Sequence, residues 1–190
     1  MPKTVHKSAF FYLQIVLSVL FILLFSVRLF LQRSEKLPSY YPMPDFTLTE
    51  RSGKPATCAV LAGKVWIADF IFTRCAGQCP MMSAQMSRLS RQMKDIYFMS
   101  FSVDPEYDTP EVLSNYANGY EADHERWLFL TGSKEEINRV AAGLKLNRID
   151  EPMMHSARFI LIDRKGYVRG TYDSNDPERI NQLKRDARLL

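Results

Sequence analysis

The sequence predicts an α/β domain, with a mixed sheet flanked by helices, behind an N-terminal transmembrane helix. Three observations lead to this prediction. Apolar runs of strand length alternate with amphipathic helical patterns through most of the chain. Cys75 and Cys79 fall where one of these runs gives way to a helical pattern. An uncharged stretch occupies residues 8–27, and 190 residues suffice for one domain plus such an extension.

The uncharged stretch has the length of a membrane span. Residues 8–27 hold Gln14 as their single strongly polar side chain, and the run continues past Arg28 to residue 31. Twenty helical residues rise about 30 Å, which matches the hydrocarbon thickness of a bilayer. A cleaved signal peptide is the alternative, but its apolar core is shorter, about 7–15 residues, and ends in a small-x-small cleavage site. We therefore predict a short tail over 1–7 and an uncleaved anchor over 8–31.

A proline-rich segment follows the predicted anchor. Three prolines fall within residues 37–44, and prolines hold the backbone extended. We predict a stiff spacer over 32–44 and a folded domain over 45–190. The formal net charge of +4 comes with no clustered basic face of the kind that nucleic-acid binders carry, so no nucleic-acid partner is expected.

The first half of the domain predicts a strand, a helix and a second strand. Residues Val65–Phe72 are rich in β-branched and aromatic side chains, which suits a strand covered on both faces. A helix is predicted over Met81–Met93, because apolar side chains recur there at helical spacing. Ile96–Val103 is again apolar and predicts the next strand. The helical positions expected to be buried are Met82, Met86, Leu89 and Met93.

The middle of the domain carries two helix starts around a short strand. Thr109 is followed by Pro110 and an acid, which is the pattern of an N-cap and a first helical turn. Trp127–Leu130 predicts a short strand. Ser133 opens a capping-box pattern, so a helix is expected from there to about Leu144.

The last third predicts a hairpin and a closing helix. Residues Ala157–Ile162 and Tyr167–Tyr172 flank a turn that contains Gly166. Pro177–Leu189 is helical, with Ile180, Leu183 and Ala187 turned inward. Strand–helix–strand–helix followed by a hairpin and a helix is the order of a thioredoxin-like domain. We expect a sheet that is parallel at its centre, with the hairpin antiparallel at one side and the functional groups beyond the strand ends.

The two cysteines form either a redox pair or part of a soft-metal site. Pro80 suits a first helical turn, which places Cys79 at the helix start, where the dipole and free N–H groups favour a thiolate. Packing in the core is the alternative for a cysteine. A structural zinc site is not expected, because it takes four ligands in two close pairs and the chain has three Cys and three His.

His155 offers a third partner for the dithiol. It lies just before the hairpin strand, and in a thioredoxin fold the loop that enters this strand packs beside the two cysteines. A lone His is more often a surface or core residue, but this predicted proximity favours a ligand. Two thiolates and one imidazole suit copper, so the predicted metal ligands are Cys75, Cys79 and His155.

The other sulfur and imidazole groups are weaker candidates. Cys58 has no Cys or His beside it in the sequence, so we expect it to pack in the core. His124 lies among charged residues and is expected to be solvated, and His6 precedes the uncharged stretch. Thioethers also bind cuprous ion, but Met is a common core filler. The methionines that flank the predicted ligands are Met81, Met82, Met153 and Met154.

The chain resembles the SCO/SenC family of membrane-anchored copper proteins. Its motifs, in order, are Phe70-Ile71-Phe72-Thr73-Arg74-Cys75 with Cys79-Pro80, Ser102-Val103-Asp104-Pro105 with Asp108-Thr109-Pro110, Trp127 to Gly132, and His155-Ser156 with Leu161-Ile162-Asp163. The resemblance implies a thioredoxin-like domain facing the periplasm or the mitochondrial intermembrane space. It also implies copper on Cys75, Cys79 and His155, and a role in building the copper centre of cytochrome c oxidase.

The resemblance further implies partners and a location. The expected partners are the copper-binding subunit of the oxidase, the membrane and another copper donor protein. No Arg- and Ser-rich transit peptide precedes the anchor, which favours a bacterial inner membrane with a periplasmic domain over a mitochondrion. The chain departs from the family pattern at Ala76 and Gly77, where many members have proline and an acidic residue.

Two functions remain open from the sequence. The first is a copper metallochaperone, which is not an enzyme in the turnover sense and needs all three predicted ligands. The second is a thiol–disulfide oxidoreductase that reduces cysteines of an oxidase subunit or another extracytoplasmic protein, with Cys75 and Cys79 as its redox pair. A peroxiredoxin-type peroxidase is a distant third. Such an enzyme attacks peroxide with one Cys held by a Thr and an Arg, and Thr73 and Arg74 are nearby, but the paired Cys79 and the His fit it less well.

Overall fold

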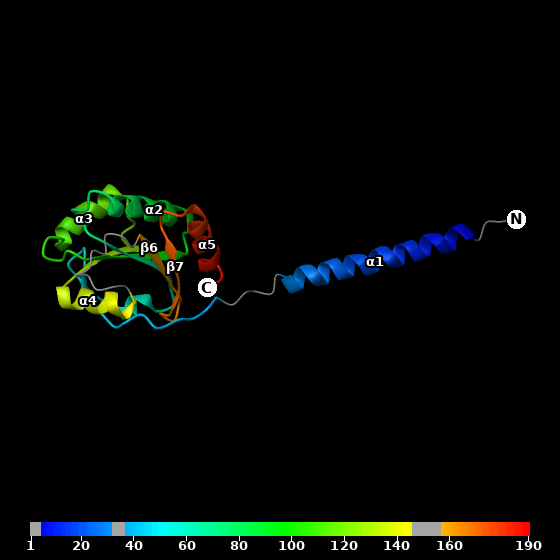
Figure 1. Cartoon of the computed structure of the whole chain (residues 1–190), viewed down its shortest axis with the longest axis horizontal. Coiled ribbons are helices and arrows are strands. Elements are labelled where there is room, and N and C mark those ends of the chain that lie inside the picture. Colours follow the sequence, from blue (N-terminus) through cyan, green and yellow to red (C-terminus); the bar gives the residue numbers. More distant parts are fainter. Residues whose placement is uncertain (1–4, 32–36, 146–156) are drawn as a thin grey trace. The chain divides into compact units, whose positions relative to one another are not determined.

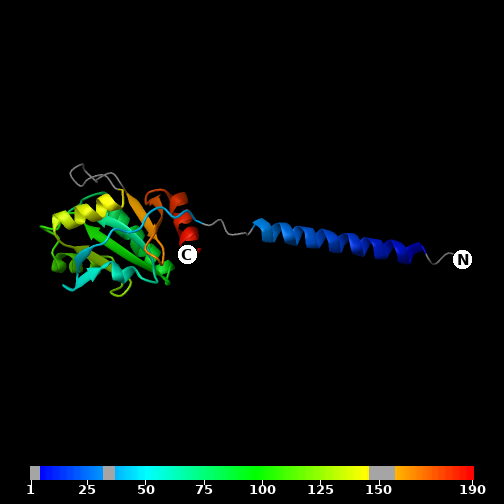
Figure 2. The same ribbon diagram turned by 90° about the horizontal axis from the view of Figure 1, so that it is seen from below.

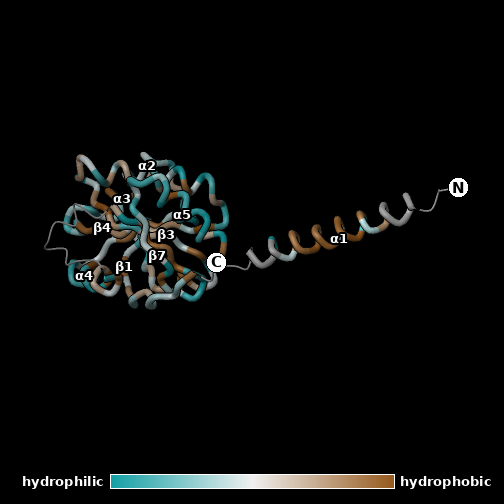
Figure 3. Tube along the Cα trace, turned by 45° about the vertical axis from the view of Figure 1, so that its right-hand side comes forward, coloured by the Kyte–Doolittle hydropathy of each residue, from teal (hydrophilic) through white to brown (hydrophobic). Residues whose placement is uncertain are grey.

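A computed structural model describes residues 5–31, 37–145 and 157–190 (Figure 1). The chain divides into two units, Met1–Lys36 and Leu37–Leu190. The first unit is the helix α1, Val5–Leu31, whose central turns are hydrophobic (Figure 3). Among the residues that the structure describes, no helix is long and apolar enough to cross a membrane. The transmembrane anchor over 8–31 therefore stays a prediction.

The second unit is built on one mixed sheet of seven strands. Its centre is parallel, because β3 pairs with β4 and β4 with β5 in the same direction. The hairpin of β6 and β7 is antiparallel and lies at one side, as predicted. The spatial order is β2-β1-β5-β4-β3-β6-β7. The bounds are β1 Thr47–Glu50, β2 Pro55–Thr57, β3 Val65–Ile71, β4 Ile96–Ser102, β5 Trp127–Thr131, β6 Arg158–Ile162 and β7 Val168–Asp173.

Helices cover both faces of this sheet (Figures 1 and 2). Buried side chains of α2, α3 and α5 join one core cluster, and those of α4 join the cluster on the other face. Each predicted helix is present, and the caps at Thr109 and Ser133 accept the expected backbone hydrogen bonds. The bounds are α2 Gln78–Gln92, α3 Pro110–Gly119, α4 Lys134–Gly143 and α5 Pro177–Ala187, with a 3-10 turn at Cys58–Leu61.

Strand β3 is buried on both faces, which explains its continuous apolar sequence. Ile67 and Ile71 belong to the cluster under α2, whereas Trp66 belongs to the cluster on the α4 side. Neighbouring residues of a strand point to opposite faces, so a strand at the centre of two layers needs apolar side chains throughout. The predicted buried positions of α2, Met82, Met86, Leu89 and Met93, are all in the core.

Strands β1 and β2 have no clear signal in the sequence and were not predicted. Each is short, four and three residues, and their sequences are mostly polar. Leu48 and Ala56 are the only side chains of these strands in the core. A period of two cannot be recognised in so few residues, and the pairing of β1 with β5 is decided by the rest of the sheet.

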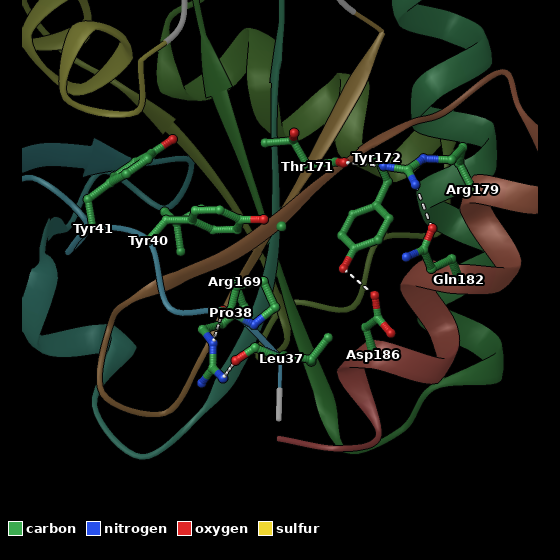
Figure 4. A pocket seen from close by; sticks show the side chains of 12 residues that line it. Leu37, Pro38, Tyr40, Tyr41, Arg169, Thr171, Tyr172, Arg179, Gln182 and Asp186 are labelled. Carbon is green, nitrogen blue, oxygen red and sulfur yellow. Dashed lines mark hydrogen bonds between the residues drawn. The ribbon is translucent and has the colours of Figure 1, made fainter. Parts of the chain in front are cut away.

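Residues 37–44, which belong to the predicted stiff spacer, pack on the domain, and we call them the N-terminal strap. The N–H of Tyr40 donates to the carbonyl of Val168 (3.0 Å), and the N–H of Val168 donates to the carbonyl of Tyr41 (2.9 Å). Arg169 donates to the carbonyls of Leu37 and Pro38 (Figure 4). The extended backbone of the strap thus pairs with the outer edge of β7, where free N–H and C=O groups need partners.

Candidate metal and thiol site

Cys75 and Cys79 lie beyond the carboxyl ends of the parallel strands. Strand β3 ends at Ile71, and the N–H of Cys75 donates to the carbonyl of Phe72 (3.2 Å), which tightens the turn after the strand. Cys79 lies in the first turn of α2, whose N-cap is Gly77. This is the end of an α/β sheet at which functional groups gather, and the predicted placement is confirmed.

The two cysteines form one site. The backbone N–H of Cys79 points at the sulfur of Cys75 over 3.4 Å. Both thiols are free. Cys75 is half-buried, whereas Cys79 is 6% exposed and belongs to the core cluster under α2. One sulfur therefore faces the surface, and the other faces the interior.

The surroundings of the two sulfurs push their pKa values apart. Partial burial of Cys75 opposes its ionisation, but hydrogen bonds from the N–H groups of Cys79 and Gly77 outweigh this and lower the pKa of Cys75. Burial raises the pKa of Cys79 to about 12, and the nearby Cys75 adds to the rise. The expectation that Cys79 is the thiolate was therefore wrong. The free N–H groups of the helix start point at the residue ahead of the helix, and Cys79 turns into the core.

A buried carboxyl group lies on the same side of the sheet as Cys79. Asp69 of β3 is completely buried, and neither of its oxygens has a hydrogen-bond partner among the described residues. Burial raises the pKa of Asp69 to about 7. Its charge also contributes to the raised pKa of Cys79. The sequence signal was available, because Asp69 interrupts an otherwise apolar strand.

A second buried carboxylate holds the turn that carries Cys75. Asp108 is fully buried and accepts hydrogen bonds from the backbone N–H of Thr73 (3.2 Å) and from the hydroxyls of Thr73 and Ser102 (2.5 Å each). These contacts join the loop after β3 to the loop after β4. On the surface, Arg74 donates to the carboxylate of Asp104 (3.0 and 2.6 Å).

The start of α2 is also tied to α5. The side-chain amide of Gln78 donates to the side-chain oxygen of Asn175 (3.1 Å), just before the N-cap of α5 at Asp176. The dithiol is thus fixed from three directions, by the loop after β3, the loop after β4 and the start of α5. A site supported in this way keeps its geometry when a ligand or client approaches.

The structure describes only some of the other candidate ligands. His155, Met153 and Met154 lie outside the described residues. Met82 is 2% exposed in the core, which leaves Met81, at 57%, as the exposed methionine of this helix turn. Among described residues, no group of three or more His, Cys, Asp or Glu side chains gathers to hold a metal.

Cys58 lies in the cluster on the other face of the sheet. Its sulfur accepts the N–H of Phe46 (3.2 Å) and its thiol donates to the carbonyl of Pro44 (3.2 Å). Burial raises the pKa of Cys58. These contacts support the predicted packing role. His124 is exposed, as expected.

A cavity of about 350 Å³ lies between the strap, β7 and α5 (Figure 4). Its charged side chains are already hydrogen-bonded to other groups of the domain. Arg169 holds the strap and Asp163, the hydroxyl of Tyr172 donates to Asp186 (2.7 Å), and Arg179 donates to the carbonyl of Thr171 (3.1 Å). This cavity therefore joins the strap to the domain and adds no group to the dithiol.

The second unit is similar to known proteins along nearly all of its length. Residues 35–188 match the family model described as SCO1/SenC. The SCO1 protein homolog of Bacillus subtilis (strain 168) is 37% identical over 148 residues, which cover 73% of this chain and 77% of that protein.

Solved structures show the same similarity. One is described as revealing a disulfide switch in BsSco, a member of the Sco family of cytochrome c oxidase assembly proteins. It has a TM-score of 0.70 at 33% identity, over 80% of this chain and 96% of the other. Bradyrhizobium japonicum ScoI with copper bound has a TM-score of 0.62 at 28% identity, over 77% of this chain and 99% of the other.

Proposed function

This chain belongs to the SCO1/SenC family, and from that membership we propose that it is a copper metallochaperone that assists assembly of the copper centre of cytochrome c oxidase. The observation that carries the proposal is the pair of free sulfurs, Cys75 and Cys79, held together at the carboxyl end of the parallel strands. Its copper-bound relative and its oxidase-assembly relative support the same reading.

The donor set fits copper as a cargo. Two thiolates and an imidazole are ligands that suit copper in either oxidation state, and His155 supplies the imidazole in this proposal. Cys75 offers a thiolate near the surface because its pKa is lowered, whereas Cys79 must release a proton before it can ligate. Uptake of the metal therefore begins at Cys75 and releases a proton from Cys79.

A thiol–disulfide oxidoreductase is the second candidate, favoured by the same separation of pKa values. The Cys75 thiolate attacks a client disulfide, forms a mixed disulfide and expels one client thiolate. Cys79 then loses its proton and attacks the Cys75 sulfur, which expels the second client thiolate and leaves a Cys75–Cys79 disulfide. The client gains two electrons and the pair loses two. The relative with a disulfide switch supports this chemistry.

The proposal includes a location and partners. In it, α1 holds the domain at a bacterial inner membrane on the periplasmic side, where the oxidase subunit and a copper donor protein are the partners. Support comes from the large apolar side chains of α1, which are mostly more than half exposed from Phe11 to Phe25. A long exposed apolar surface needs a cover of lipid or protein.

The test compares single variants of the full-length reduced protein. Copper content after titration should be one ion per chain in the wild type and in His124→Ala, the matched control. His155→Ala should lose stable cupric binding and keep weaker cuprous binding, because two thiolates satisfy cuprous ion alone. Cys75→Ser and Cys79→Ser should lose both.

Maturation of the oxidase in cells then separates the two candidates. If His155→Ala blocks formation of the copper centre, copper carriage is the function. If assembly is normal with His155→Ala but fails with either Cys variant, the metallochaperone proposal is wrong and the protein is a reductase.

A further inference from the structure

Positive side chains gather at the end of the domain opposite the dithiol. Arg164, in the turn between β6 and β7, donates to the carbonyl of Leu190 (2.9 Å) and to the carbonyl of Gly63 (3.1 Å). These bonds bring together the hairpin turn, the end of α5 and the start of β3. We call this region the basic end; its cations are Arg164, Lys165, Lys184, Arg185 and Arg188.

Most of the charge of the basic end is not neutralised by acidic side chains of the domain. Arg164 is held by the backbone oxygen of Leu190, and the other four cations form no ion pair with the described residues. The acids beside them are turned inward. Asp163 is paired with Arg169 (2.8 Å), and Asp186 is 9% exposed and accepts the hydroxyl of Tyr172. On the neighbouring strand, the exposed Asp95 precedes β4 with a lysine beside it.

The dipole of α5 accounts for only some of the cations in the basic end. Cations at the C-terminus of α5 complement the helix dipole. Arg164 and Lys165, however, come from a hairpin turn, and Leu189, which follows Arg188 in the sequence, is 55% exposed. An exposed apolar side chain next to Lys and Arg is a feature of surfaces that meet lipid headgroups.

The chain enters the domain beside this surface. Leu37 lines the cavity together with Asp186 of α5, and its carbonyl is held by Arg169 (Figure 4). Six residue steps separate Leu37 from Leu31, the last residue of α1. An extended chain advances about 3.5 Å per step, so any surface that holds the end of α1 lies within roughly 20 Å of Leu37.

We infer that the basic end docks on anionic phospholipid headgroups of the membrane to which α1 is attached. This inference rests on the proposed attachment of α1. Lys and Arg near an anionic surface each strengthen binding by about fivefold, and salt screens the effect. The dithiol lies at the other end of β3, seven residues of about 3.3 Å away, so a docked domain presents Cys75 roughly 20 Å above the headgroups.

The test measures amide hydrogen exchange of the full-length protein in two kinds of vesicle. One kind is pure phosphatidylcholine, and the other contains about three-tenths phosphatidylglycerol. Exchange at 163–167 and 184–190 should slow at least threefold in the anionic vesicles alone, and about 0.5 M NaCl should remove the difference. Exchange at the start of α2 should be the same in both.

Two triple variants decide whether the basic end is responsible. Lys165→Gln/Arg185→Gln/Arg188→Gln should lose the difference between vesicles and keep the copper content of the wild type. The matched control, Lys54→Gln/Arg88→Gln/Lys134→Gln, also removes three exposed cations that form no ion pair with the described part of the chain, and it should keep the difference. Equal exchange in both vesicles for the wild type, or an equal loss in both triple variants, would overturn the inference.

Two further measurements separate docking of the basic end from attachment through α1 and from binding of a soluble anion. Flotation with pure phosphatidylcholine reports attachment through α1, so failure there contradicts the anchor, while the salt-sensitive difference in anionic vesicles still tests the basic end. Slowing of the same peptides by inorganic phosphate without vesicles, at equal ionic strength, would assign the surface to a soluble anion instead and overturn the membrane partner.

Discussion

The backbone N–H of Cys79 points at the sulfur of Cys75, 3.4 Å away, while the thiol of Cys79 is itself buried in the core. One residue thus stabilises the thiolate of its partner through its backbone and keeps its own proton through its surroundings. The start of α2 makes the two sulfurs chemically unequal before any ligand or client arrives.

This inequality predicts selective alkylation. In a Cys58→Ser background, iodoacetamide at pH 7–8 should modify Cys75 far faster than Cys79, because the pKa of Cys75 is lowered and that of Cys79 is raised to about 12. Mass spectrometry of the digested protein gives the two rates. Denaturation in urea is the control and should bring the rates together. Faster reaction at Cys79 in the folded protein would contradict the assignment.

Asp69 predicts a loss of stability as the pH rises. Its folded pKa is about 7, above the ordinary 3.8, so folding favours the protonated carboxyl. The stabilising contribution is complete below about pH 4 and is lost as the pH rises towards 7. Asp69→Asn removes the ionisation and should be the more stable protein at pH 8, by an amount on the order of a few kcal/mol.

Urea unfolding between pH 4 and pH 8 checks this dependence. The gap between Asp69→Asn and the wild type should close towards pH 4. The control Asp95→Asn changes an exposed carboxylate and should follow the wild type at every pH. A wild-type stability that does not fall between pH 4 and pH 7 beyond that of Asp69→Asn would show that the buried carboxyl is not protonated.

Loss of the Asp108 carboxylate is predicted to destabilise the turn that carries Cys75. Asp108→Ala leaves the hydroxyls of Thr73 and Ser102 and the N–H of Thr73 without their acceptor, so the free energy of unfolding should fall by about 2–4 kcal/mol. Asp104→Ala is the matched control, since it breaks a surface ion pair with Arg74 and should lose much less. Denaturant unfolding measures both, and equal losses would refute the role of Asp108.

Cys58 is predicted to be dispensable for metal. Cys58→Ser keeps a group that can accept from Phe46 and donate to Pro44, so it should retain one copper per chain and lose on the order of 1 kcal/mol of stability. Copper content and thermal unfolding test this together. A variant that folds but binds no copper would place Cys58 in the ligand set, contrary to its position on the other face of the sheet.

Elements with a continuous apolar run or a clear helical spacing of apolar residues could be predicted from the sequence. Elements that form only by pairing with distant segments could not. Val65–Ile71 and the four buried positions of α2 carry their own signal. The prolines of the strap predict an extended backbone, but its pairing with β7 and the pairing of β1 with β5 depend on partners far away in the sequence. Placement of both cysteines followed from the strand–helix junction, as predicted.

The electrostatics of the dithiol site and of the basic end depend on where side chains point and on which segments meet in space, and neither can be derived from the sequence. Which sulfur receives the helix N–H groups was decided by the side chain of Cys79 turning inward. The basic end was missed because Arg164 lies in the hairpin turn whereas Arg185 and Arg188 lie at the end of α5, and the bonds of Arg164 to Gly63 and Leu190 bring these regions together. His155 lies outside the described residues, so its role as a ligand stays a prediction.

The pairing of the strap with β7 has a consequence for molecules crowded together on a surface. Open sheet edges recruit one another, and confinement to two dimensions raises the frequency of such encounters. Here the strap occupies one edge through Tyr40 and Tyr41, and Pro55 begins the three-residue strand at the other. Among the described residues, the strap pairs with the start of β7 at Val168 and β2 has three residues, so each edge leaves only a short run of N–H groups for a strand of a neighbouring copy.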